Sequence, residues 1–332
     1  MAATLLGLAQ ALAAIGDFLK DVEFECKSFS TITDGTHKIS VDWVDLVWAA
    51  VTYGKGNASQ LIAYKWHSIA ELIVRAHSVY AYLRDGSTGY EKSDLYSKLD
   101  ATEKGAASYF LGMTMCKIFA AQKLNTPWLF HVSLASSNGA SIVFSKMSKE
   151  RPDLVGYTAN SNWIVAEAKG RSKKLSTKAL VKAKNQSRMI KSVNGTLPLH
   201  RFGIQTYFDP HLKVNVEDPP ASREAYPVDI DLREALVNYY SLTSTLSRHG
   251  ERREIGGEQY LVSTDPRSGL SVGLPVKIAT QPVLQSRAAE LHREPKYVSD
   301  REKIYSDGIY VSLDERWAPT NMSKQPNDRS GG

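Results

Sequence analysis

Apolar residues in the first third of the chain mostly recur at every third or fourth position, which is the spacing of an amphipathic helix. Two stretches carry this pattern, 41–53 and 59–83, and a glycine-containing break at 54–57 separates them. We therefore expect residues 1–99 to form a helical N-terminal region.

The period of the pattern changes after residue 100 and predicts a segment of mixed helix and strand. A helix is expected over 101–124, because Asp100 and Glu103 have the spacing of a capping box and Pro127 follows its end. Alternating stretches and one more helical stretch follow it, in the order strand 128–135, strand 154–157, strand 163–168, helix 175–193 and strand 202–208. Residues 100–210 are therefore expected to form a core of helix, three strands, helix and strand.

The pattern is looser beyond residue 210. It predicts a helix over 231–247, a β-rich stretch over 254–278 with a turn at 265–269, and a strand over 308–313. We therefore expect an α+β C-terminal extension over 211–317. Residues 318–332 are polar and rich in Pro, Gly, Asn and Ser, which predicts a disordered tail.

Composition places the chain among soluble globular proteins. Its 332 residues are 42% apolar and 23% charged, and no run of apolar residues is long enough for a membrane span. The first 19 residues are apolar but lack a basic start, which favours an amphipathic helix over a signal peptide. Cys26 and Cys116 are the only two cysteines, so neither a disulfide framework nor a zinc site is expected, and the location is predicted to be cytoplasmic.

Positive charge is concentrated in one part of the chain. The net charge is +6, and residues 168–208 contain no Asp or Glu but ten Lys and Arg. Such a cluster attracts polyanions, whereas a solvated helix face normally mixes both signs. The cluster therefore predicts nucleic-acid binding by Arg171, Lys173, Lys174, Lys178, Lys182 and Arg188.

The start of the cluster coincides with a group of residues that suits metal chemistry. Glu167 and Lys169 end an apolar stretch, and alternation along a strand points both side chains to one face. Burying such charges in an apolar setting is costly, which favours a functional role. Together with Asp153 after Pro152, they predict a site in which Asp153 and Glu167 bind Mg²⁺ or Mn²⁺ and Lys169 orients a water or stabilises charge on phosphorus. The alternative for Glu167 and Lys169 is an ion pair on an exposed edge strand.

These residues, Pro152-Asp153 and Glu167-x-Lys169, resemble the two halves of the PD-(D/E)XK nuclease motif, over about a third of the chain. The resemblance implies a restriction-endonuclease-like α/β core, in which a mixed sheet is flanked by helices. It also implies a metal-dependent endonuclease that hydrolyses phosphodiester bonds, with DNA favoured over RNA because most relatives cut DNA. By the same analogy the chain would be a bacterial anti-phage defence effector, as one subunit of a complex or a homo-oligomer.

Two further residues are candidates for catalytic support. Gln186 is the one polar member of a stripe along the 175–193 helix, and members of the resembling family carry a Gln near the active site there. Glu103 begins the 101–124 helix, where the family often supplies a third acidic residue. A structural amide and a capping box, respectively, remain open alternatives for the two. His131 is a weaker candidate, because a partly buried structural histidine is the more common case.

Two other functions remain open at this level. The first alternative to a nuclease is a nucleic-acid-binding subunit that has lost the chemistry. The second is a scaffold whose helical region mediates assembly. The chain contains no Gly-Lys-Ser/Thr loop for ATP and no Gly-x-Ser-x-Gly nucleophile motif.

Overall fold

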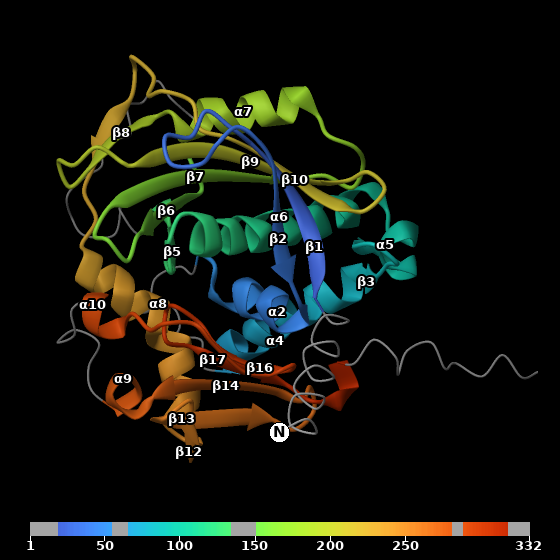
Figure 1. Cartoon of the computed structure of the whole chain (residues 1–332), viewed down its shortest axis with the longest axis vertical. Helices are drawn as coiled ribbons and strands as arrows, with labels where there is room; N and C mark the ends of the chain where they lie inside the picture. The colour runs from blue at the N-terminus through green and yellow to red at the C-terminus, as the bar shows by residue number, and fades with distance from the viewer. Residues whose placement is uncertain (1–18, 55–65, 134–150, 281–287, 318–332) are drawn as a thin grey trace, which may run out of the picture.

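The computed structural model describes residues 19–54, 66–133, 151–280 and 288–317, and these residues form two large sheets and two small two-stranded ones, with helices around them (Figure 1). The larger sheet has seven strands in the order β2-β1-β10-β9-β7-β6-β5. Its strands are β1 Lys20–Lys27, β2 Gly35–Val41, β5 Trp128–His131, β6 Leu154–Tyr157, β7 Trp163–Gly170, β9 His200–Phe208 and β10 Leu212–Glu217. The fold is mixed α/β, as expected.

The centre of this sheet is a meander followed by a crossover. Strands β5, β6 and β7 pair antiparallel, and the chain then passes through α7 (Thr177–Ser187) to β9, which is parallel to β7. Helix α6 (Ala101–Lys123) lies on the other face of the sheet from α7 (Figure 1). The predicted capping box at the start of α6 is confirmed, since the side chains of Asp100 and Glu103 each accept the other's backbone N–H.

The expectation of a mostly helical region up to residue 99 is wrong for residues 20–41. Strands β1 and β2 occupy this stretch, and β1 pairs with β10, so both belong to the large sheet. The signal was a period of two, because Val22, Phe24 and Cys26 are buried and alternate with charged or polar residues. The large sheet therefore extends beyond 100–210 in both directions. The helices of the N-terminal region are α2 Trp43–Thr52, α4 Trp66–Tyr82 and α5 Asp94–Lys98, and β3 Leu83–Asp85 pairs with β4 Tyr90–Lys92.

The helix expected over 175–193 is too long. Helix α7 ends at Ser187, and residues 190–193 form a strand, β8 (Ile190–Val193), that pairs with β11 (Tyr226–Val228). Apolar residues spaced by three or four continue across this break, so the sequence pattern alone did not reveal it. Leu180, Ala183 and Ser187 are the residues of α7 that are buried.

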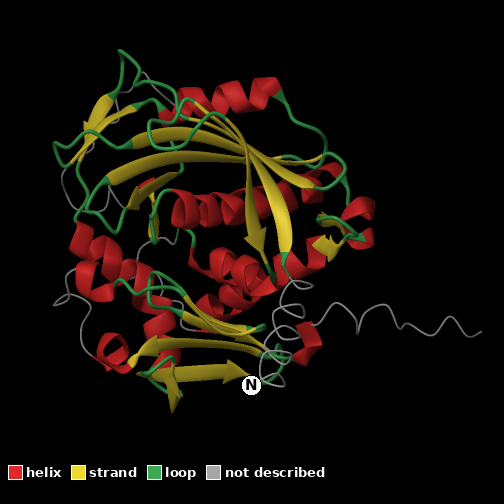
Figure 2. Ribbon diagram, viewed as in Figure 1, coloured by secondary structure: helices red, strands yellow, loops and turns green. Residues whose placement is uncertain are grey.

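The C-terminal part forms the second sheet, with strand order β12-β13-β14-β17-β16-β15. The predicted turn at 265–269 is confirmed, and Gly269 adopts a positive φ of 69° there. Residues of the predicted tail lie outside the described part. The elements are α8 Leu232–Ser247, β12 Glu251–Ile255, β13 Glu258–Asp265, β14 Leu270–Pro275, α9 Val276–Thr280, α10 Ala288–Leu291, β15 Lys296–Ser299, β16 Glu302–Ile304, β17 Tyr310–Leu313 and the short 3-10 helix η3 Glu315–Trp317. Figure 2 shows helices between and around the two sheets.

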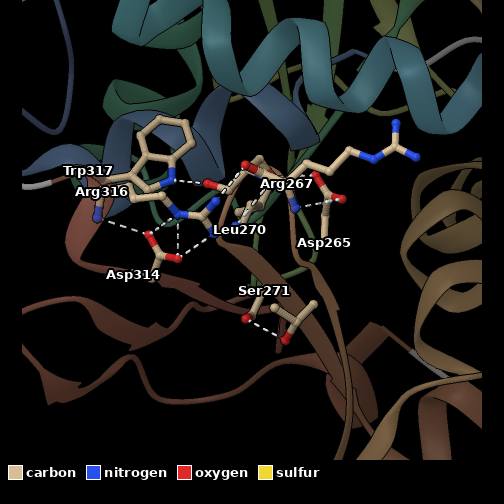
Figure 3. A network of polar contacts seen from close by, with 9 residues as sticks. Asp265, Arg267, Leu270, Ser271, Asp314, Arg316 and Trp317 are labelled. Atoms are coloured by element: carbon tan, nitrogen blue, oxygen red, sulfur yellow. Dashed lines mark hydrogen bonds and ion pairs between the residues drawn. The ribbon is translucent and has the colours of Figure 1, made fainter.

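Polar contacts fix the last described residues to the β13–β14 turn (Figure 3). Arg316 contacts Asp314 through two nitrogens and donates to the carbonyl of Arg267 at 2.7 Å. The indole N–H of Trp317 donates to the carbonyl of Ser268 at 2.7 Å. The Trp317 ring also stacks on His77 of α4, so this contact joins the second sheet to the N-terminal helices.

A buried polar network makes a second connection, which joins helices α2, α6 and α8 to the β16–β17 turn of the second sheet. The ammonium of Lys117 on α6 donates to the hydroxyl of Tyr239 at 2.7 Å and lies 3.9 Å from a carboxylate oxygen of Asp307. That carboxylate oxygen also accepts hydrogen bonds from Tyr239 at 2.6 Å and from the Trp48 indole at 3.0 Å. Lys117 and Asp307 are fully buried, and burial lowers the pKa of Lys117 to about 8.

Candidate active site

The two halves of the predicted motif meet between neighbouring strands. Asp153 precedes β6 and Glu167 lies on β7, and the backbone N–H of Asp153 donates to Oε2 of Glu167 at 2.7 Å. Glu167 is fully buried, whereas Asp153 is partly exposed. A buried carboxylate that reaches across to the next strand connects the two segments that carry the proposed metal ligands.

The ammonium of Lys169 contacts the other carboxylate oxygen of Glu167, Oε1. The two residues therefore point to one face of β7, as strand alternation predicted. Lys169 remains 28% exposed in its side chain while Glu167 is buried, so the pair is not an ion pair on an exposed edge strand. Strand β7 lies inside the sheet, between β9 and β6.

The environment of Glu167 raises its pKa to about 8. Burial is the main cause, and the nearby negative charge of Asp153 adds to it, while Lys169 acts in the opposite direction. The effect of burial on the pKa is larger than that of Lys169, so without a metal the carboxyl of Glu167 is protonated in much of the neutral range. A bound cation would favour the charged carboxylate instead. Perturbed pKa values of this kind are common at functional sites and also occur in structural networks.

Close packing of α7 defines the face on which the site lies. Glu167 pairs with Gly203 and Lys169 pairs with Gln205 across β7 and β9. A Cβ at Gly203 would lie 2.6 Å from the backbone nitrogen of Lys184, so only glycine allows α7 to approach this closely. Gly203 thus places α7 on the same face of the sheet as Glu167 and Lys169.

Gln186 on α7 contacts the chain segment that leads into Asp153. Its side-chain nitrogen donates to the carbonyl of Arg151 at 3.0 Å. Its side-chain oxygen is buried and has no hydrogen-bond partner among the described residues. This contact with a backbone carbonyl fits a structural amide as well as a residue near the active site, so both interpretations of Gln186 remain open, and its oxygen is an acceptor for a water or a ligand.

Glu103 lies away from this group. It is exposed at the start of α6, and its carboxylate accepts the backbone N–H of Asp100 at 3.0 Å. The charged side chains that act on Glu167 are Asp153 and Lys169. The position of Glu103 thus agrees with the capping role and brings it no contact with the other candidate residues in the described part.

His131 ends β5 next to the site. The backbone N–H of Val132 donates to the carbonyl of Asp153 at 2.9 Å, which joins the two strand ends. Nδ1 of His131 lies 2.7 Å from the hydroxyl of Ser133 and 3.1 Å from its backbone nitrogen. Burial lowers the pKa of His131, and the charge of Asp153 partly opposes this. A neutral histidine held by Ser133 fits the structural interpretation.

The basic residues divide into exposed and paired groups. Arg188 is half-buried and donates to the carbonyl of Pro220 at 2.8 Å, and Lys184 pairs with Glu217 at 2.6 Å. Lys174 lies 3.3 Å from Asp209 but is 80% exposed. Acidic residues just outside the 168–208 window therefore neutralise part of its charge. The exposed members are Arg171, Lys173, Lys174, Lys178, Lys182 and Lys191.

Two residues near the site were not singled out from the sequence. Gln205 is fully buried, accepts from the backbone N–H of Ser176 at 2.7 Å and donates to its carbonyl at 3.0 Å, so it holds the start of α7 against β9. Its signal was a polar side chain alternating with apolar ones on a strand. Tyr109 of α6 is 44% exposed, and the charges of Asp153 and Glu167 contribute to raising its pKa after burial, the main cause. It carried no sequence signal beyond being aromatic.

The donor set suits Mg²⁺ or Mn²⁺ held by two carboxylates. A side-chain hydrogen bond between Asp153 and Glu167 contributes to raising the pKa of Glu167, so the two carboxyls lie close together. A cation between them would replace this bond and the contact of Glu167 with Lys169. Mg²⁺ is commonly bound by one or two carboxylates, with waters and substrate phosphate completing its shell. Within residues 19–54, 66–133, 151–280 and 288–317, no three His, Cys, Asp or Glu side chains form a cluster able to hold a metal by themselves. A cation here therefore needs waters or phosphate as additional ligands.

Comparison with known proteins gives no further assignment. No protein-family model, no curated protein sequence and no solved structure matches this chain. Among the described helices, none combines the length and the apolar character that crossing a membrane requires.

Proposed function

We propose that this chain is a metal-dependent nuclease that hydrolyses phosphodiester bonds. The observation that carries the proposal is the contact of Glu167 with both the Asp153 backbone and the Lys169 ammonium. Two carboxylates and an ammonium thereby converge beside a surface with exposed basic residues. The cofactor would be Mg²⁺ or Mn²⁺, held by Asp153 and Glu167.

The architecture around the site supports a restriction-endonuclease-like core. Helix α6, the meander β5-β6-β7, crossover helix α7 and parallel strand β9 follow the order that the PD-(D/E)XK resemblance implies. The proposed ligands lie at the junction of the second and third strands of this unit. The additional strands β1, β2 and β10 extend the sheet on the side away from the site.

In this proposal the metal ligands, Lys169 and Gln186 have different roles. A cation held by Asp153 and Glu167 would polarise the phosphate and lower the pKa of a bound water. Lys169, partly exposed and on the face of Glu167, orients the attacking water or stabilises negative charge that develops on the phosphate oxygens. The unpartnered oxygen of Gln186 accepts a hydrogen bond from a water near Asp153.

Nucleic acid is the proposed substrate because the exposed cations adjoin the site in sequence and in space. Arg171, Lys173 and Lys174 follow directly after Lys169, and Lys178 and Lys182 are exposed on α7. These contacts would bind the phosphate backbone and carry no sequence information. DNA is favoured over RNA on the resemblance alone, as is a role in defence, whereas the proposed cytoplasmic location rests on the two free cysteines, Cys26 and Cys116.

The proposal is tested by incubating purified protein with supercoiled plasmid, linear duplex DNA, single-stranded DNA and RNA. Each substrate is tested with Mg²⁺, with Mn²⁺ and with EDTA. Cleavage that requires the metal supports the proposal and identifies the substrate. Salt-sensitive binding without any cleavage would instead favour a nucleic-acid-binding subunit.

A further inference from the structure

A second constellation of reactive side chains lies at the other face of the large sheet. His200 is at the start of β9, and its Nδ1 lies 2.5 Å from Oδ2 of Asp218. Its Nε2 lies 2.9 Å from the hydroxyl oxygen of Thr31, in the connection between β1 and β2. A hydroxyl, an imidazole and a carboxylate from three distant parts of the chain are thus joined in a line.

The arrangement sets the direction of the hydrogen bonds. Asp218 also accepts the backbone N–H of Arg201 at 2.8 Å through Oδ1, which fixes its carboxylate. In the tautomer that carries its proton on Nδ1 and donates it to this carboxylate, Nε2 is free to accept the proton of the Thr31 hydroxyl. This is the geometry of a nucleophile, a general base and an orienting acid.

The histidine of this constellation is buried, whereas the hydroxyl-bearing residue is exposed. His200 is 1% exposed and the ring of Phe29 packs against it, with 5.1 Å between ring centres. Thr31 is exposed, so a reacting group has access to its hydroxyl from solvent. The backbone N–H groups of Ile32 and Thr33 donate to no acceptor in the described part of the chain.

This constellation is separate from the proposed nuclease site. His200 and Phe202 point to the face covered by α6, where Phe202 packs on Phe119. Gly203, the partner of Glu167, faces α7 instead. The two sites therefore occupy opposite faces of the sheet, and variants at one leave the other intact.

We propose that Thr31, His200 and Asp218 form an acyl-transfer site that hydrolyses small activated esters through an acyl-threonine. The Thr31 proton passes to Nε2 of His200 as the hydroxyl oxygen bonds to the ester carbonyl carbon. The bond from that carbon to the leaving alkoxide then breaks, and His200 returns its proton to the leaving group. A water that loses a proton to Nε2 next attacks the acyl-threonine, releasing the carboxylic acid and restoring the hydroxyl.

The competing interpretation is a brace that holds the β1–β2 connection on the sheet. A brace needs the hydrogen bonds but forms no covalent intermediate. The two interpretations differ for Thr31→Ser, which keeps the hydroxyl and reduces its crowding, and for Thr31→Val, which keeps the shape and removes the nucleophile. Both changes are at an exposed position, so the fold tolerates them better than a change at buried His200.

The test uses p-nitrophenyl acetate with the full-length protein, nitrophenolate release as the rate, and peptide mass spectrometry of acid-quenched samples. Wild-type protein is expected to carry one acetyl group on Thr31, Thr31→Ser to react at least as fast, and Thr31→Val to lose the acetylated peptide. Asp218→Asn is expected to react more than 10-fold slower, because its amide favours the wrong imidazole tautomer. Asn185→Ala, at an exposed position on α7, serves as the control that leaves this rate unchanged. Absence of acetyl-Thr31, or a rate unaffected by Thr31→Val, would overturn the proposal and leave the brace.

Discussion

The backbone N–H of Asp153 donates to the carboxylate of Glu167 at 2.7 Å, although fourteen residues separate the two in sequence. This bond means that the side chain of Glu167 positions the backbone of Asp153. Both residues are the proposed metal ligands. The other oxygen of Glu167 contacts Lys169. Glu167 is thus the central residue of the site. Its raised pKa indicates that burying the charged form of its carboxyl costs free energy of folding.

Replacing Glu167 with Gln is expected to abolish metal-dependent cleavage and to stabilise the metal-free protein above about pH 5. The pKa of Glu167 rises from 4.5 to about 8 on folding. The stabilisation that the protonated carboxyl of Glu167 contributes to the folded state is therefore complete below pH 4.5 and is lost as the pH rises through 8. The gain of the variant at pH 8 should be up to about 4 kcal/mol, from the difference between 4.5 and about 8 at about 1.4 kcal/mol per pH unit. Urea unfolding at pH 5 and pH 8 in EDTA measures it.

The matched control for this change is Glu23→Gln on β1. Glu23 pairs with Lys213 at 2.7 Å, and the hydrogen bond with Lys213 lowers its pKa. This variant should gain nothing at pH 8, since the native carboxylate is favoured there. Equal effects of the two substitutions would contradict the account of Glu167.

Gln186→Ala is expected to lower the cleavage rate about 10-fold or more while nucleic-acid affinity stays near that of the wild type. Its amide joins α7 to Arg151 and leaves an oxygen free near Asp153. Asn185→Ala is the control, because Asn185 is the exposed neighbour on the same helix. Single-turnover rates and fluorescence-anisotropy affinities separate the two effects. A lost affinity with an unchanged rate would assign Gln186 to binding instead.

Lys178→Gln with Lys182→Gln is expected to weaken nucleic-acid binding and to reduce the salt dependence of log Kd by up to about two units. Both lysines are exposed on α7, the helix that also carries Gln186. Arg252→Gln with Arg253→Gln on β12 removes the same charge from the second sheet and should change the slope little. Affinity titrations between low and moderate salt give the slopes. Equal slopes for both double variants would show that binding depends on net charge alone.

Lys117→Met is expected to destabilise the protein by about 3–5 kcal/mol, because it leaves Asp307 buried without its cation. Adding Asp307→Asn should recover part of this loss. Lys213→Met, at an exposed pair, should cost no more than about 1 kcal/mol. Urea unfolding of the single and double variants measures the coupling. A loss near zero for Lys117→Met would mean that this network does not join helices α2, α6 and α8 to the second sheet energetically.

Local patterns predicted the elements that local interactions determine. The capping box of Asp100 and Glu103 fixed the start of α6, and alternation placed Glu167 and Lys169 on one face of β7. The pattern failed at residue 188, where apolar spacing continued through the end of α7 into β8. It also failed at 20–41, where β1 is stabilised by pairing with β10, almost two hundred residues away.

The site was predicted in part for the same reason. Spacing in the sequence indicated Asp153, Glu167 and Lys169 as candidates. The ion pair of Lys184 with Glu217 and the position of Gln205 at the start of α7 depend on the tertiary structure. Glu103 illustrates the converse, since one sequence pattern supported both a capping role and a catalytic role. The orientation of α6 gives it the capping contact.

Single-turnover cleavage of the best substrate by Lys169→Met, compared with Lys173→Met, tests the central claim most directly. Both changes remove one lysine from the same basic segment, but only Lys169 contacts Glu167. The account predicts a loss of at least about 100-fold in rate for Lys169→Met and a change of less than a few-fold for Lys173→Met. Equal rates for the two variants, or metal-independent cleavage by either, would contradict a catalytic site at Asp153, Glu167 and Lys169.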